Sequence, residues 1–350
     1  MRSLSSYRHR PGVHCASAAL RNMAVHHTGE RWTEAMCFGL AAGLNFTYVR
    51  EFGAPFFLVM GRGSYMESHF CDAIEAQLEV SHADDAELAW QHLKACIDAK
   101  QLAMVDTDMF ELPYMVQRLN LPEGMHFGGH KLLVTGYDEA AGTVQLADYA
   151  WLEPRVVALD RFKIARDSRE CPSRPRNACF VFHFPDELPP RRRSIRAALA
   201  TVVNQMRHPF RQYNGLLAIE RFCRQVTKWH LSMQGEDLRR NLALAAFMLE
   251  RAGTGGGAFR NLYARFMAEA ADELGAAAIA ESARLYRSLA MRWREAAALL
   301  DAAAEDPATG MFAPGPAARQ LMAAIDAEEH QAIELIATYL ADSRHTKALQ

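Results

Sequence analysis

Three residues of this chain, Cys15, His130 and Asp148, have the types and the order that nucleophilic catalysis requires. A cysteine becomes an effective nucleophile when a histidine takes its proton and a third group holds that histidine in the right tautomer. His130 begins one strand-like segment and Asp148 ends the next, so antiparallel pairing would bring both side chains to the same end of a hairpin. If the helix that carries Cys15 packs against this hairpin, the three side chains form a catalytic triad.

The surroundings of Cys15 favour an ionised thiol. Gly12 permits a sharp turn, and the small and apolar residues from 16 to 25 predict a buried helix that begins at the cysteine. The helix dipole and an adjacent imidazolium would lower the pKa of such a thiol into a range of roughly 3.5–7.5. The N–H of Cys15 at the helix start would also donate to an oxyanion. Taken alone, this stretch favours a buried structural cysteine, and the hairpin downstream reverses that interpretation.

The first half of the chain alternates between helical and strand-like patterns. Strands are predicted over 130–138 and 143–148 around a turn, and further β segments over 155–158 and 178–184 complete an antiparallel sheet. Upstream, the periodicity predicts helices over 15–26, 32–42, 65–78 and 84–100, the last with Asp84 as its N-cap, and strands over 45–50, 55–60 and 101–106.

Beyond residue 185 the composition changes to Ala, Leu, Arg and Glu at helical spacing. Two prolines followed by three arginines, residues 189–193, predict a solvated linker, with phosphate binding by the arginines as the alternative. Helices are then predicted over 194–206, 213–231, 236–251, 258–274, 277–304 and 316–341. We therefore expect an α+β domain over residues 1–187 and an all-α domain over residues 188–350.

Composition and charge argue against several classes of function. The 350 residues are half hydrophobic with a formal net charge of -2, which makes nucleic acid or an anionic membrane surface an unsuitable main partner. No apolar run approaches the length of about 20 residues that a membrane span requires, so we expect a cytoplasmic protein. Seven irregularly spaced cysteines without a Cys-x-x-Cys pair indicate reduced thiols and no metal site.

The helix start and the hairpin together resemble a known superfamily. Similarity to the papain-like superfamily, particularly its C39-like branch, is carried by Gly12-Val13-His14-Cys15 and by a hairpin that runs from Gly129-His130 through Val134-Thr135-Gly136-Tyr137-Asp138 to Ala147-Asp148. The N-terminal pattern and the later Gly253-Thr254-Gly255-Gly256-Gly257-Ala258-Phe259-Arg260 resemble the butirosin biosynthesis protein H family, whose second half is a DUF4872-type domain of unknown function. This resemblance covers nearly the whole chain and implies a papain-like catalytic domain with an antiparallel sheet, followed by a helical domain.

The family resemblance implies a cysteine-dependent acyltransferase of specialised-metabolite biosynthesis. In such a reaction, an acyl group on the phosphopantetheine thiol of an acyl carrier protein moves to Cys15 and then to a small amine acceptor, with no other cofactor bound. Thioester exchange is nearly thermoneutral, and His130 could deprotonate the amine after it has activated Cys15. C39-like relatives use a glutamine six residues before the cysteine as the second oxyanion donor. Here that position is His9, which becomes the candidate donor.

Further residues are candidates for substrate binding. One is His14 beside the nucleophile, and others precede His130, where they could line the pocket or bind an amino group but could equally cap a loop: Asp106, Asp108, Glu111 and Tyr114. A glycine run with a nearby arginine could present backbone N–H groups to the phosphate of phosphopantetheine, although helix termination and restart explains it as well: Gly255, Gly256, Gly257 and Arg260.

Two other classes of function fit the same residues. A peptidase or amidase would use the same triad in an open cleft, and a non-catalytic scaffold would keep a papain-like fold without turnover. We expect the helical domain to act as a lid or to bind the substrate or the carrier protein. This favours the transferase, because closure over an acyl-enzyme excludes water. The Ala- and Leu-rich helices also suit a homodimer interface.

Overall fold

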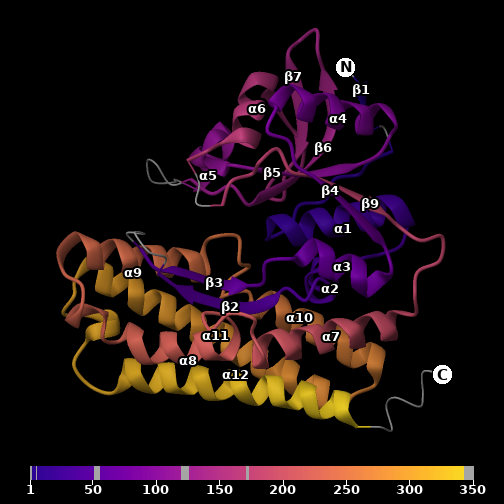
Figure 1. The fold of residues 1–350 in the computed structure, drawn as a ribbon. Coiled ribbons are helices and arrows are strands. Elements are labelled where there is room, and N and C mark those ends of the chain that lie inside the picture. Colours follow the sequence, from indigo (N-terminus) through magenta and orange to yellow (C-terminus); the bar gives the residue numbers. More distant parts are fainter. Residues whose placement is uncertain (1, 5, 51–55, 120–125, 171–172, 343–350) are drawn as a thin grey trace. The chain divides into compact units, whose positions relative to one another are not determined.

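The computed structural model describes residues 2–4, 6–50, 56–119, 126–170 and 173–342 (Figure 1). The chain forms two compact units, each built from two segments. Unit 1 comprises Met1–Glu34 and Glu75–Glu187, and unit 2 comprises Ala35–Ile74 and Leu188–Gln350. Each unit is described by itself below.

Unit 1 contains a seven-stranded antiparallel sheet, as the alternating patterns predict. The strand order is β4-β9-β5-β6-β7-β8, and β1 pairs with β6 at its far end. The β6–β7 hairpin is the one expected from the sequence. The pairing register of its two strands shifts between Val134 and Gly136. The strands are β1 (Arg2–Ser3), β4 (Gln77–Ser81), β5 (Ala103–Thr107), β6 (His130–Asp138), β7 (Thr143–Ala147), β8 (Arg155–Ala158) and β9 (Cys179–His183).

Helices cover this sheet because its strands are apolar on the faces that they bury. Helix α1 packs against β6 and begins at Cys15, with His14 as an N-cap whose ring accepts a hydrogen bond from the N–H of Ser17. It ends at Gly29, whose φ of 69° is the left-handed conformation common at helix C-termini. The helices of unit 1 are α1 (Cys15–Thr28), α4 (Ala86–Asp98), α5 (Pro113–Leu119) and α6 (Leu159–Asp167).

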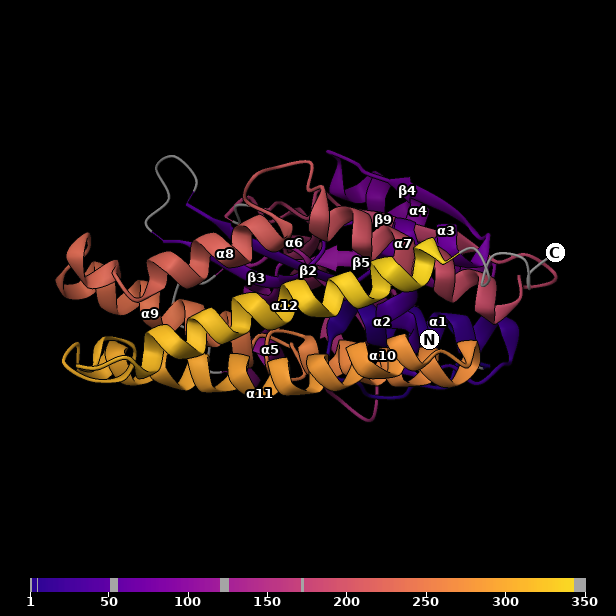
Figure 2. The same cartoon turned by 90° about the horizontal axis from the view of Figure 1, so that it is seen from below.

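Unit 2 joins a small β-hairpin to a set of helices. Strands β2 and β3 pair antiparallel and pack against α8 and α9, while α9, α10 and α12 pack against the long helix α11 (Figure 2). The elements are α2 (Glu34–Leu40), β2 (Leu44–Val49), β3 (Leu58–Arg62), α3 (Met66–Ile74), α7 (Arg191–Arg207), α8 (Gly215–Val226), α9 (Gly235–Glu250), α10 (Arg260–Leu274), α11 (Ala277–Glu305) and α12 (Ala317–Ala341). The helical C-terminal region expected from the sequence is therefore present.

The division of the chain differs from the expected continuous domain over residues 1–187. The break near residue 187 coincides with a unit boundary, but residues 35–74 belong to unit 2. The physical reason is aromatic burial, since Phe46 of β2 packs against Phe222 and Trp293 of the helices. Burying an aromatic side chain contributes on the order of 2–3 kcal/mol, which is enough to draw a short hairpin into a helical core.

Several local expectations also need correction. The arginine run is not a linker, because α7 begins at Arg191 directly after Pro190, a residue suited to a helix start. Asp85 rather than Asp84 caps α4, and its carboxylate accepts hydrogen bonds from two backbone N–H groups. The helix predicted over 65–78 ends at Ile74, and the edge strand β4 begins at Gln77. Part of the predicted strand over 55–60 lies outside the described residues.

No helix among the described residues is both long enough and apolar enough to cross a bilayer. The cysteines of the described ranges are all free and buried: Cys15, Cys37, Cys71, Cys96, Cys179 and Cys223. Cys171 lies outside those ranges.

Candidate active site

The fold of unit 1 brings Cys15, His130 and Asp148 together. Cys15 is the first residue of α1, His130 is the first residue of β6, and Asp148 directly follows β7. His130 Nε2 lies 2.8 Å from Asp148 Oδ2, and His130 is close enough to Cys15 to lower the pKa of the thiol through hydrogen bonding and charge. Because Asp148 occupies Nε2, Nδ1 is the ring nitrogen left for the thiol. All three side chains are buried, with exposed fractions of 8%, 1% and 0% in chain order.

The electrostatics of this group favour a thiolate and an imidazolium. Burial raises the pKa of the Cys15 thiol, but His14 and His130 outweigh it and hold that pKa well below its ordinary value. Burial lowers the pKa of His130, yet the Asp148 charge and hydrogen bond, together with Cys15, raise it to about 10. These shifts favour the charged pair of thiolate and imidazolium, which is the state that a nucleophilic cysteine requires.

His14 also influences the thiol, because its charge contributes most among the groups that lower the pKa of Cys15. Its Nδ1 lies 3.1 Å from Ser17 Oγ, which in turn donates to Glu34 Oε1 at 3.0 Å. The Glu34 carboxylate also accepts the backbone N–H groups of Val13 and His14. Glu34 thus holds the turn before Cys15 in place, a role that no spacing pattern in the sequence indicates.

The first turn of α1 leaves the N–H of Cys15 available to an oxyanion. The N–H of Gly12 donates to the Tyr149 carbonyl at 2.7 Å, and those of Val13 and His14 are taken by Glu34. Within the described part of the chain, no acceptor is bonded to the N–H of Cys15. A helix N-terminal N–H next to the nucleophile is the arrangement that stabilises a tetrahedral intermediate.

His9 does not face the thiol. Its Nε2 lies 3.1 Å from the Asp148 carbonyl oxygen and 2.9 Å from that of Trp151, and its Nδ1 lies 2.9 Å from the Tyr7 hydroxyl. Burial, its main influence, lowers the pKa of His9. With both ring nitrogens engaged, His9 anchors the loop that carries Asp148, and the expected oxyanion role has no geometric support.

Only one of the four candidates that precede His130 reaches the triad. The Tyr114 hydroxyl donates to Asp148 Oδ2 at 3.0 Å. Asp106 forms an ion pair with Lys131 at 2.7 Å, and Glu111 pairs with Arg161 at 3.0 Å. Both contacts are structural alternatives to the expected substrate binding.

Asp108 is fully buried, and its carboxylate bonds several segments of unit 1 together. Its carboxylate accepts hydrogen bonds from Ser168 Oγ and from the N–H groups of Phe110 and Phe127, and it lies 2.6 Å from His126 Nδ1. Asp108, Glu111 and His126 place potential ligand atoms within 4.8 Å of one another. Because these hydrogen bonds already satisfy the Asp108 oxygens, the cluster is explained without a metal ion.

In the glycine run of unit 2, the N–H groups of Gly256 and Gly257 already donate to neighbouring side chains and are not available to a phosphate. The N–H of Gly256 donates to Thr254 Oγ1 and that of Gly257 to Glu250 Oε2. Gly257 has a φ of +60°, and a Cβ there would lie 2.3 Å from a backbone oxygen of Ala290, so packing and conformation both require glycine. Gly255 is likewise in the left-handed region. The interpretation as a helix restart is therefore the better one.

Arg260 is fully buried and forms part of the core of unit 2. Its Nε lies 2.6 Å from Glu329 Oε1, and Nη1 donates to the carbonyls of Asn45 and Gly61. The expectation that Arg260 binds substrate phosphate is thus not supported, because Glu329 already neutralises it.

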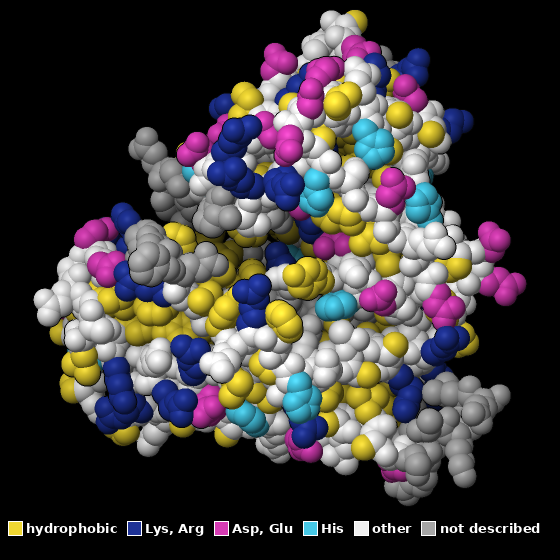
Figure 3. Space-filling view, in the orientation of Figure 1, with side chains coloured by type: hydrophobic (Ala, Val, Ile, Leu, Met, Phe, Trp, Pro, Cys, Tyr) yellow, Lys and Arg dark blue, Asp and Glu magenta, His cyan; other side chains and the backbone are white. Residues whose placement is uncertain are grey.

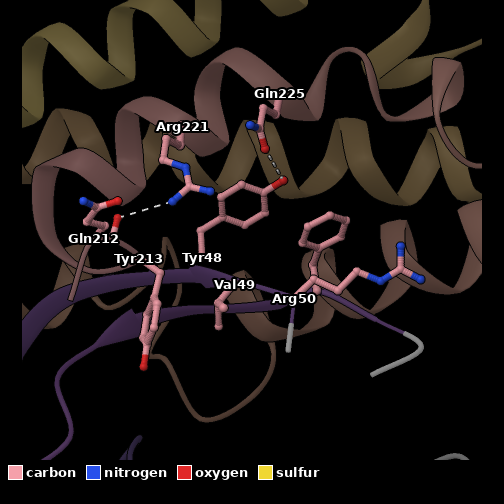
Figure 4. A pocket seen from close by; sticks show the side chains of 8 residues that line it. Tyr48, Val49, Arg50, Gln212, Tyr213, Arg221 and Gln225 are labelled. Atoms are coloured by element: carbon pink, nitrogen blue, oxygen red, sulfur yellow. Dashed lines mark hydrogen bonds between the residues drawn. The ribbon is translucent and has the colours of Figure 1, made fainter. Parts of the chain in front are cut away.

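Unit 2 also carries a surface pocket of about 330 Å³ (Figure 4). Tyr48 and Arg221 line it, and the Tyr48 hydroxyl donates to Gln225 Oε1 at 2.9 Å. No cysteine or histidine lines this pocket.

Comparison with family models assigns both halves of the chain. Residues 14–149 match the model described as butirosin biosynthesis protein H, N-terminal, and this range includes Cys15, His130 and Asp148. Residues 160–336 match a domain of unknown function, DUF4872. No curated protein matches the chain significantly. The chain belongs to the butirosin biosynthesis protein H-like family, in which this N-terminal region is followed by a DUF4872 domain.

Proposed function

We propose that this protein is a cysteine-dependent acyltransferase with a papain-like active site. It moves an acyl group from the phosphopantetheine thioester of an acyl carrier protein, through a Cys15 acyl-enzyme, to a small amine. The observation that carries the proposal is the buried Cys15 thiol beside His130, whose Nε2 lies 2.8 Å from Asp148. The biosynthetic description of the N-terminal family favours synthesis over breakdown.

The first half-reaction transfers the acyl group to the enzyme. The Cys15 thiolate attacks the thioester carbonyl and a new C–S bond forms. The oxyanion that results accepts a hydrogen bond from the N–H of Cys15. When the tetrahedral intermediate collapses, the C–S bond to pantetheine breaks, and the leaving thiolate takes the proton of His130. His130 is then neutral and acts as the base of the next step.

The second half-reaction transfers the acyl group to the acceptor. The amine nitrogen attacks the Cys15 thioester while His130 accepts its proton, and the C–S bond to Cys15 breaks to release the amide. The thiolate and imidazolium are restored, which is the charge state that the site favours at rest. Water in place of the amine would give a free acid, so a hydrolase would share the first half-reaction and differ only in the second.

Intact-protein mass spectrometry tests the proposal. Mixing the protein with an acyl-carrier-protein thioester should add the mass of one acyl group, and Cys15→Ala should abolish the adduct. Cys96→Ala is the matched control, because Cys96 is a buried thiol of unit 1 packed in the hydrophobic core. Addition of amines should discharge the adduct as an amide. Absence of any adduct across several acyl chains would contradict the proposal, and discharge to water alone would identify a hydrolase.

A further inference from the structure

A cluster of two arginines and two aromatic residues lies beside the triad in unit 1. The guanidinium of Arg118 lies 5.1 Å from the ring centre of Trp151, and that of Arg155 lies 5.9 Å from Trp151 and 5.8 Å from Tyr114. The two rings meet edge to face at 4.9 Å. Both arginines are exposed, whereas the two rings are partly buried against the core of the unit. Cation–π contact of this kind holds a guanidinium plane in one orientation.

This cluster is connected directly to the catalytic group. The Tyr114 hydroxyl is bonded to Asp148, and the Trp151 carbonyl oxygen lies 2.9 Å from His9 Nε2. The neighbouring Tyr149 lies edge to face with His130 at 6.0 Å. Burial raises the pKa of the Tyr149 hydroxyl, the Cys15 charge raises it further, and the Arg118 charge lowers it. Tyr149 is therefore within electrostatic range of both the thiol and Arg118.

Neither of these two arginines forms an ion pair with a carboxylate within the described part of the chain. Other arginines of the same unit do have such partners, as Arg2 has Asp98 and Arg161 has Glu111. Figure 3 shows basic side chains beside α5 on one face of unit 1, with acidic side chains close to them. Asp148 is joined to the cluster through the Tyr114 hydroxyl and is itself bonded to His130. Among the described residues, the two arginines are therefore cations without an ion-pair partner beside the candidate catalytic group.

We propose that Arg118 and Arg155 bind the phosphate of the phosphopantetheine donor, with Trp151 and Tyr114 fixing the two guanidinium planes. The inference rests on the proposed function. An arginine whose face is stacked keeps its edge N–H groups available, and these match a phosphate in bidentate fashion. Phosphate and thioester stand at opposite ends of the pantetheine arm, so the arm would run over unit 1 from this cluster to Cys15. A carboxylate on the acceptor shares the same anionic chemistry and is the alternative source.

Two donors that differ only in the phosphate separate these sources. The rate of Cys15 acylation is measured with an acyl-phosphopantetheine and with the same acyl-pantetheine. We expect the double variant Arg118→Gln and Arg155→Gln to lower kcat/KM for the phosphorylated donor roughly 10- to 100-fold, mainly through KM, because charge-assisted hydrogen bonds are lost. The unphosphorylated donor should react as before. Arg2→Gln is the matched control, since Arg2 pairs with Tyr137, toward the opposite end of β6 from His130.

Other outcomes overturn the assignment. An equal loss of kcat/KM with both donors would mean that the arginines only support Asp148 through Tyr114 and Trp151. A rise confined to the KM of a carboxylate-bearing acceptor would place the anion on the acceptor.

A binding measurement tests the proposed phosphate site independently of acyl transfer. Cys15→Ala is titrated by calorimetry with pantetheine 4′-phosphate and with pantetheine. Preference for the phosphorylated compound, lost in the double arginine variant, supports the site even if no acyl-enzyme forms, whereas equal affinities contradict it.

Discussion

Each unit buries a charged cluster, but the two clusters serve different ends. In unit 1, Asp148 holds His130, and His130 faces the thiol of Cys15. In unit 2, Arg260 is bonded to Glu329, and Trp293 Nε1 donates to the same carboxylate oxygen at 2.8 Å. Both clusters are almost fully enclosed. The first contains a thiol beside an imidazole, whereas the second is an ion pair of a guanidinium with a carboxylate.

The comparison shows that buried charge alone does not identify a catalytic site. The Arg260 cluster joins chain segments that are distant in sequence, because Arg260 donates to the carbonyls of both Asn45 and Gly61. The His130 cluster is instead built around a reactive atom. Asp148 Oδ1 has no hydrogen-bond partner within the described ranges, so Oδ2 alone serves both His130 and Tyr114.

The largest effect is expected from breaking the cluster of unit 2. Arg260→Met leaves Glu329 buried without its cation and removes three bonds to carbonyls, which should lower the free energy of unfolding by about 3–5 kcal/mol. Urea unfolding followed by circular dichroism measures this loss. Arg239→Met, which breaks the exposed pair with Glu236, is the control and should change little. Equal stability of the two variants would show that the buried cluster is not structural.

Breaking the cluster of unit 1 should change reactivity more than stability. His130→Gln should slow acylation of Cys15 by about 10²- to 10⁴-fold, because the proton donor and acceptor are lost.

The pH profile gives a second measure of that variant. In the wild type the depressed thiol pKa keeps Cys15 ionised as the pH falls well below 9, and acylation declines above about pH 10, where His130 loses its proton. In His130→Gln the thiolate loses one of the two histidines that lower its pKa, so the midpoint of alkylation by iodoacetamide should move to higher pH. Peptide mapping isolates the signal of Cys15, and an unchanged midpoint would rule out the ion pair.

The smallest effect tests the support of Asp148. Tyr114→Phe removes one hydrogen bond to the carboxylate that orients His130, and about 1 kcal/mol, or roughly fivefold in acylation rate, should be lost. Tyr65→Phe is a suitable control, since Tyr65 is exposed in unit 2. A loss as large as that of His130→Gln would mean that Tyr114 contributes to the chemistry itself.

Local pattern was sufficient for the parts of the site that lie on one hairpin. His130 and Asp148 flank two alternating segments joined by a short turn, and antiparallel pairing over such a turn sets their proximity. The C-terminal helices were predicted to within a few residues, as in α11, because an amphipathic period repeated over many turns leaves little choice. The weak edge strand β4 was missed, since only pairing with β9 identifies it.

The sequence by itself therefore determined the β6–β7 hairpin, the C-terminal helices and the pairing of histidine with aspartate, which depend on short-range periodicity and turn geometry. Tertiary structure alone decided which polar groups surround the thiol, where Glu34 and His9 hold the flanking loops. It also decided that residues 35–74 join the helices and that Arg260 is already neutralised by Glu329. These outcomes depend on contacts between distant segments, in which burial and the need to pair each buried polar group outweigh local preference.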